Sequence, residues 1–150
     1  MTARTVAGTG LIWMAAALFA LEGVGQERTK GGKQDSVYAE LTKVPEKKRA
    51  LQNPLAKDPD AAAAGGVLFE EHCEECHGVG GAGGKKAPSL RVVEVQAASD
   101  GAILYILSNG IVRKRMPVWS KLPEPQRWQL VSYIKSLGVA ELEKSVGNKP

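Results

Sequence analysis

The feature that most constrains this chain is the segment FEEHCEECHG at residues 69–78, which holds both cysteines and both histidines of the sequence. Within it, Cys73, Cys76 and His77 form the pattern C-x-x-C-H. On a helix, residues three and four positions apart lie on one face, so these three side chains would point the same way. His72 precedes His77 by five positions, which turns it about 140° away around a helix. The spacing therefore predicts a site built by Cys73, Cys76 and His77 without His72.

Several kinds of site use a cysteine pair of this spacing. A thiol–disulfide redox pair normally accompanies a βαβ unit, and no segment of this sequence alternates convincingly as a strand. A structural disulfide across so short a loop would stabilise the fold little. Zinc takes four ligands, often from two separated pairs, whereas every candidate here lies in one short segment. The favoured interpretation is one covalently bound haem c, with Cys73 and Cys76 in thioether bonds and His77 on the iron.

A second axial ligand is expected at Met116. Met1 and Met14 lie in a segment that we expect to be removed, which leaves Met116 as the only methionine of the mature chain. Pro117 disfavours helix at the residue before it, so the sequence predicts a loop that presents the thioether of Met116. Thioether sulfur is an established axial ligand of haem iron. If Met116 does not bind, a five-coordinate haem would act as a gas sensor or a peroxidase, and this alternative stays open.

The first 25 residues predict export. Arg4 precedes the apolar run LIWMAAALFAL, and small residues follow it, which is the order of a secretory signal. The run is shorter than the roughly 20 residues that a membrane-spanning helix needs. We expect cleavage after Ala20 or Gly25 and a mature periplasmic protein, soluble or membrane-associated, that has no transmembrane span.

The remaining sequence predicts one compact domain. Residues 26–59 are polar and interrupted by glycine and proline, so we expect a linker or a surface strap, with a short helix near Pro45. The domain itself is expected over residues 60–139, followed by a tail at 140–150. Because no strand pattern is present, the domain should be all-α with long loops.

Capping residues set the expected helix ends. Asp60 is expected to be the N-cap of the first helix of the domain, and the glycines in AAAAGG suggest a close crossing with another helix. Ser99 or Asp100 should cap a central helix that ends at Asn109–Gly110. The last helix, in PEPQRWQLVSYIKSLG, is expected to end at Gly138.

Composition excludes one class of function. The formal net charge is +4, but no dense run of Lys and Arg is interleaved with aromatic residues, which argues against nucleic-acid binding. Only 5% of the residues are aromatic, and a small core of this kind is often completed by a cofactor.

With these motifs in place, the chain resembles the class I cytochromes c over about residues 60–138. The resemblance implies an all-α cytochrome c fold, in which three to four main helices and long loops surround one covalently bound haem. It also implies that Gly65 and Phe69 lie on an amino-terminal helix that crosses a carboxy-terminal helix at Leu130 and Tyr133.

The resemblance further implies the roles of individual residues. Pro88, in the segment APSL, would accept a hydrogen bond from His77 through its carbonyl, and Leu90 would pack on the haem. With His77 and Met116 as metal ligands, the implied activity is one-electron transfer between redox proteins and not catalysis. The alternative is a fixed haem c subunit of a larger oxidase or dehydrogenase.

Redox partners would dock at a basic rim around the haem edge, if the fold is as implied. The candidate residues of this rim are Lys85, Lys86, Arg113, Lys114 and Arg115. The alternative is a basic loop that is merely solvated.

Overall fold

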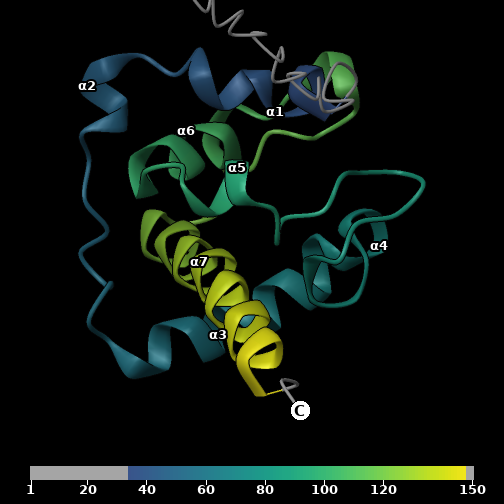
Figure 1. Cartoon of the computed structure of the whole chain (residues 1–150). Helices are drawn as coiled ribbons and strands as arrows, with labels where there is room; N and C mark the ends of the chain where they lie inside the picture. The colour runs from purple at the N-terminus through teal and green to yellow at the C-terminus, as the bar shows by residue number, and fades with distance from the viewer. Residues whose placement is uncertain (1–33, 148–150) are drawn as a thin grey trace, which may run out of the picture.

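Helices joined by long loops make up the structure, a computed structural model that describes residues 34–147 (Figure 1). The longer helices are α1 (Gln34–Thr42), α3 (Pro59–His72), α6 (Asp100–Asn109) and α7 (Glu124–Gly147). The short ones are α2 (Glu46–Arg49), α4 (Glu74–His77), α5 (Val93–Gln96) and the 3-10 turns η1 (Val79–Gly81) and η2 (Val112–Lys114).

The predicted all-α class is confirmed. Over residues 34–147, β-structure is limited to one isolated antiparallel bridge between Ile111 and Met116. None of the helices in this range is long and apolar enough to cross a membrane. The expected signal at residues 1–25, both cleavage sites, Met1 and Met14 lie outside the described residues, as do residues 148–150.

The core of the fold is the crossing of α3 and α7 (Figure 1). A Cβ atom at Gly65 would lie 2.0 Å from the backbone oxygen of Gln129, so only glycine lets the two helices come this close. One turn further along α3, the ring of Phe69 lies 5.1 Å from that of Tyr133. Phe69, Leu130 and Val131 are fully buried at this crossing. The crossing expected from the glycines is therefore confirmed.

Capping differs from the sequence prediction at α3 and agrees with it at α6. The N-cap of α3 is Asp58, whose side chain accepts a hydrogen bond from the amide of Asp60 at 3.0 Å. The expectation of Asp60 as the cap is wrong because Pro59, with its fixed φ and no N–H, suits the first helical position. Ser99 caps α6 by accepting from the amide of Ala102, and Gly110, with φ 64°, ends it.

The expected end of the last helix at Gly138 is also wrong, since α7 continues to Gly147. Gly138 serves a different purpose. Its Cβ would lie 2.5 Å from the side-chain oxygen of Gln96, and the amide of Gln96 donates to the carbonyls of Leu90 and Ile134 at 2.7 and 2.9 Å. Gly138 therefore makes room for a side chain that ties α7 to the loop before α5.

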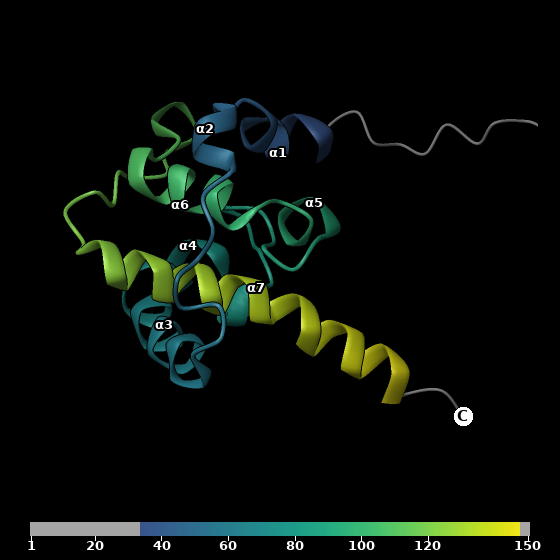
Figure 2. The same cartoon turned by 90° about the vertical axis from the view of Figure 1, so that its left-hand side faces the viewer.

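Residues 34–58, which we call the strap, lie against the domain (Figure 2). α1 and α2 pack on α6, and the short helix expected near Pro45 is confirmed as α2. An extended stretch then runs across α7 to the start of α3. Along it, the buried Asn53 side chain donates to the carbonyl of Trp128 at 3.3 Å and to the hydroxyl of Ser132 at 2.8 Å.

Candidate functional site

The C-x-x-C-H segment lies at a break between two helices. α3 ends at His72, and Cys73, with φ −123° and ψ −32°, turns the chain into α4. The amides of Cys76 and His77 both donate to the carbonyl of Cys73, at 3.1 and 2.9 Å. This single turn keeps the three side chains of the motif together, although the continuous helix assumed from the sequence is wrong.

A cavity of about 460 Å³ opens beside this turn. All six residues expected at the site line it: Cys73, Cys76, His77, Pro88, Leu90 and Met116. Its deeper wall is apolar and is formed by residues of the buried core, namely Phe69, Val95, Ile103, Leu107 and Ile134. The structure thus brings together expected site residues that are up to 43 positions apart in the sequence, from Cys73 to Met116.

His77 is held in a defined orientation. Its Nδ1 donates a hydrogen bond to the carbonyl of Pro88 at 2.9 Å, the contact that the resemblance implied. Because a carbonyl only accepts, the proton belongs to Nδ1 and the lone pair of Nε2 is left for another partner. Burial lowers the pKa of His77, and the hydrogen bond to Pro88 opposes this shift only in part. His77 is therefore neutral at pH 7, which is the form that binds a metal.

Both cysteines are free thiols in this structure. Cys73 is half-buried, and burial, with a smaller effect of Cys76, raises the pKa of its thiol to about 11. Cys76 is exposed at the rim of the cavity. Among the described residues, no cluster of three or more His, Cys, Asp or Glu side chains could hold a metal ion.

Met116 comes to the cavity from a tight loop. The amide of Ile111 donates to the carbonyl of Met116 at 3.0 Å, and the amide of Met116 donates back at 3.2 Å. Between them, Arg115 has a left-handed backbone with φ 65°. Gly110, also at positive φ, has no room for a Cβ because the carbonyl of Pro117 would lie 2.6 Å from it. This closed loop directs Met116 into the cavity, where it packs against the core.

His72 lies on the rim of the same cavity, contrary to the expectation that it points away. The ring centroid of His72 is 5.1 Å from that of Trp119, which follows the Met116 loop. An angle of about 140° between His72 and His77 requires one continuous helix, and the helix breaks at Cys73. His72 thus borders the site, but its contacts are with Trp119 and, at 3.8 Å, with Glu71.

Four of the five expected rim residues line the cavity: Lys85, Lys86, Lys114 and Arg115. Arg113 instead forms an ion pair with Glu40 of α1. Lys86 pairs with Glu75 at 2.6 Å, a contact that raises the pKa of Lys86 and lowers that of Glu75.

Sequence reasoning missed part of the cavity wall. Tyr38, Glu40 and Leu41 of the strap also line the cavity. Their segment carries only a weakly amphipathic pattern, and no motif marks it. Only their tertiary contacts place them here.

The donor set and the shape of the cavity fit haem c. An imidazole with a free Nε2 and a thioether reach one apolar space, and two thiols stand at its edge. Imidazole and thioether are an established pair of haem ligands. A largely apolar wall suits the face of a porphyrin.

Comparison with known proteins bears on the family of this chain. The family model described as cytochrome c oxidase, cbb3-type, subunit III matches residues 60–134, half of the chain. The chain belongs to the class I cytochrome c family. The match includes the C-x-x-C-H segment and Met116 but excludes the strap.

One curated relative of this cytochrome is cytochrome c550 of Pseudomonas aeruginosa, which is 30% identical over 94 residues. The aligned stretch covers 60% of this chain and 65% of the relative, so the chain spans a little less than two thirds of that protein's length. No solved structure matches the chain significantly.

Proposed function

We propose that this cytochrome is a one-electron carrier with a single haem c, attached through Cys73 and Cys76 and ligated by His77 and Met116. The observation that carries the proposal is that His77 and Met116 reach the same cavity from separate segments of the chain. When bound, haem supplies a one-electron redox couple. With both axial positions filled by side chains, no position is left for substrate, so we infer that the protein is not an enzyme.

The surrounding residues support this role by what they hold in place. The carbonyl of Pro88 fixes the tautomer of His77, which presents Nε2 to the metal and strengthens it as a ligand. Most of the cavity wall is apolar, with Leu90 part of it, and this wall would shield the face of a bound haem from water. Shielding of this kind would favour electron transfer, because little reorganisation then accompanies the change of charge.

The ligand assignment is tested by the visible spectrum of the haem-loaded protein. We expect the oxidised form to show the weak long-wavelength band that reports thioether sulfur bound to ferric haem. Met116→Ala should abolish the band and lower the reduction potential, since loss of the thioether removes a ligand that favours the reduced state. Val118→Ala, at an exposed position of the same loop, is the matched control and should retain both.

A different spectrum would contradict the ligand assignment. Absence of the band in the unmodified protein, together with ready binding of CO to its reduced form, would contradict the ligation by Met116. It would favour the five-coordinate sensor or peroxidase instead.

We propose that the protein is exported, that its signal is cleaved after Ala20 or Gly25, and that the mature periplasmic chain carries its cytochrome domain over residues 60–139. Intact mass of the protein isolated from its native host tests the cleavage, with an amino terminus at Leu21 or Gln26 expected. A mature chain that retains Met1 would contradict it.

Redox proteins with an acidic docking surface are the proposed partners. Lys85, Lys86, Lys114 and Arg115 stand around the cavity, where they would attract such a surface and raise the association rate. The rate of reduction by an acidic redox protein should fall as ionic strength rises, and charge removal at Lys85 and Arg115 together should weaken that dependence. A rate independent of salt would contradict the docking proposal.

A fixed haem c subunit is the second candidate, because the matching family is described as an oxidase subunit. Solubilisation of native membranes in mild detergent, followed by size-exclusion chromatography, separates the two. Co-elution of the cytochrome with a large catalytic subunit would favour the fixed subunit, whereas elution as a small soluble protein would favour the free carrier.

A further inference from the structure

The strap, which lies outside the family match, contributes side chains to the cavity. Tyr38 and Leu41 of α1 line the cavity, although the family model begins at residue 60. Tyr38 is only 7% exposed and belongs to the same buried cluster as Phe69 and Ile103. α1 is therefore part of the core around the cofactor site, and not a covering laid over it.

One contact of α1 reaches the His77 side of the cavity. The hydroxyl of Tyr38 donates to the carbonyl of Ser89 at 2.8 Å. Ser89 directly follows Pro88, whose carbonyl accepts from His77. The hydroxyl of Ser89 in turn donates to the carbonyl of Gly81 at 3.2 Å. Tyr38 thus braces the short segment that orients His77.

A second contact of α1 reaches the Met116 side. The carboxylate of Glu40 forms an ion pair with Arg113, which belongs to η2 within the loop closed by Ile111 and Met116. Glu40 also accepts a hydrogen bond from Lys43 at 3.0 Å, and its side chain is only 17% exposed. Because Glu40 belongs to α1, its ion pair with Arg113 links α1 to the Met116 loop.

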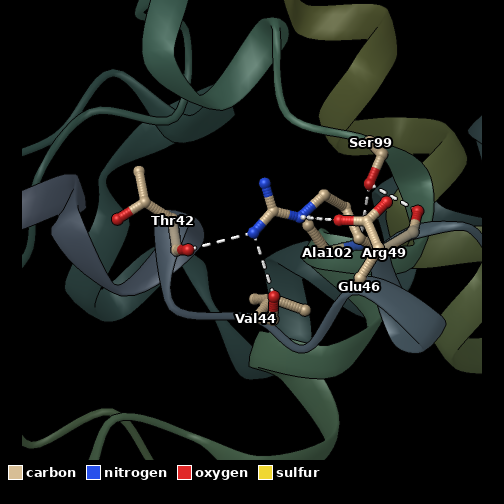
Figure 3. Close-up of polar contacts among 6 residues, drawn as sticks. All are labelled: Thr42, Val44, Glu46, Arg49, Ser99 and Ala102. Atoms are coloured by element: carbon tan, nitrogen blue, oxygen red, sulfur yellow. Dashed lines mark hydrogen bonds and ion pairs between the residues drawn. The ribbon is translucent and has the colours of Figure 1, made fainter.

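Contacts away from the cavity hold α1 in this position (Figure 3). The guanidinium of Arg49 donates to the carbonyls of Thr42 at 2.9 Å and Val44 at 3.0 Å, which closes the turn between α1 and α2. The hydroxyl of Ser99 at the start of α6 donates to the carbonyl of Arg49 at 2.8 Å.

The same junction depends on a glycine of α6. A Cβ at Gly101 would lie 2.2 Å from the carbonyl oxygen of Lys48 and 2.9 Å from that of Leu51. The backbone of the strap therefore rests directly on α6, at a site that is separate from the cavity.

From these contacts we propose that α1 is a wall of the haem pocket that joins its two ligand-bearing sides. Tyr38 and Leu41 contact the haem. The hydroxyl of Tyr38 and the carboxylate of Glu40 are positioning groups, which hold the segment around Pro88 and the Met116 loop. The inference rests on the proposed ligation by His77 and Met116, and it assigns a role to residues outside the family match.

The test is a double-mutant cycle on the haem-loaded full chain, with Glu40→Gln, Arg113→Gln and both together. The first readout is the rate at which imidazole enters the oxidised protein, which requires the Met116 loop to open. Each single variant should raise this rate about two- to fivefold, as expected for loss of one partly exposed ion pair. The double variant should be no faster than either single variant, since the pair is already broken.

Glu70→Gln, which removes a carboxylate from the exposed face of α3, is the matched control and should leave the rate unchanged.

A second readout does not depend on whether Met116 ligates the iron. Hydrogen exchange at the amides of Ile111 and Met116, which bond to each other's carbonyls, reports the opening of the loop directly. We expect faster exchange in the three variants of the cycle and not in Glu70→Gln.

Displacement of the whole strap provides an independent arm. Gly101→Ala should speed both imidazole entry and exchange more than Glu40→Gln does, because its Cβ would push the strap backbone at Lys48 and Leu51 away from α6 and so shift the segment that follows α1. Gly84→Ala, where a Cβ meets nothing closer than 4.0 Å, is its control. Unchanged rates and exchange in Glu40→Gln and Arg113→Gln, or additive effects in the double variant, would overturn the inference. Failure of the proposed function would look different. The unmodified protein would then lack the thioether band, and the exchange result would still decide whether the strap holds the Met116 loop.

Discussion

The helix crossing and the strap are both packed against the core, but they are held by different means. At the crossing, α3 and α7 meet backbone to backbone at Gly65, and aromatic and aliphatic side chains fill the space on either side. The strap also buries apolar side chains, Tyr38 and Val44 among them, but hydrogen bonds to carbonyl groups add to its attachment, as at Ser99, Asn53 and Tyr38.

This difference predicts how each region responds to change. A close-packed crossing has no free volume, so added atoms displace whole helices. Hydrogen bonds contribute about 1 kcal/mol each and break singly, so the strap should loosen in steps while the crossing remains intact. The ligand-bearing loops contact both regions, and we expect their mobility to follow the strap.

The largest effect is expected for Gly65→Ala. The new Cβ would overlap the backbone of Gln129, which cannot move aside as a side chain can, so the free energy of unfolding should fall by about 3 kcal/mol or more. Denaturant unfolding of the haem-loaded protein measures it. Gly66→Ala is the matched control, because its Cβ meets only the ring of Tyr133, at 3.2 Å. Equal losses in the two variants would contradict the backbone contact as the cause.

A smaller loss is expected for Asn53→Ala at the far end of the strap. The change removes the hydrogen bonds to Trp128 and Ser132 and leaves the amide of Leu55 without its side-chain acceptor. Unfolding should become easier by about 2 kcal/mol, and hydrogen exchange should rise over residues 50–58 before it rises in α3. Asn109→Ala, at an exposed position, should change neither. Uniform acceleration over the whole molecule would show that the strap is not a separate unit.

A loss of about 1 kcal/mol is expected for Tyr38→Phe, which keeps the ring and removes the bond to Ser89. Burial, and then the charge of Glu94, raises the pKa of Tyr38 above its usual value. A raised folded pKa means that this stabilisation is complete below the unfolded pKa of about 10 and is lost as pH rises through the folded value.

Hydrogen exchange of α1 as a function of pH provides the measurement. In the unmodified protein, the protection of α1 amides relative to their intrinsic exchange rate should fall at alkaline pH. Tyr38→Phe should reduce that pH dependence. Tyr133→Phe serves as the comparison in the crossing, since burial also raises the pKa of Tyr133. The same response in both variants would contradict a contribution specific to the strap.

The smallest effect is expected for Lys86→Ala, which touches neither region. Lys86 and Glu75 are both exposed, so their ion pair should not measurably stabilise the fold. The pair lowers the pKa of Glu75, so any contribution would be present above the unfolded pKa and lost as pH falls below about 4. Unfolding at pH 7 should be the same in variant and parent, and a clear loss would mean that the loop after α4 is part of a larger network.

Much of the site could be predicted because its information is local. The spacing of Cys73, Cys76 and His77 is readable within five residues, and Met116 was found by elimination. All of them line one cavity, while their roles as ligands stay predictions until the spectrum is measured. Helix ends were less predictable, because Pro59 moved a cap to Asp58 and the packing of Gln96 gave Gly138 a place inside a helix.

By itself, the sequence determined the helical class, the C-x-x-C-H motif, the glycine at the crossing and the loop before Pro117, since each depends on neighbouring residues or on a single steric property. Only the tertiary structure decided that His72 borders the cavity and that α1 forms one of its walls. The contact of Tyr38 with Ser89 joins residues 51 positions apart, and the segment that carries Tyr38 has little amphipathic pattern. Its place is set by polar groups on other elements, and no local pattern encodes where those groups will lie.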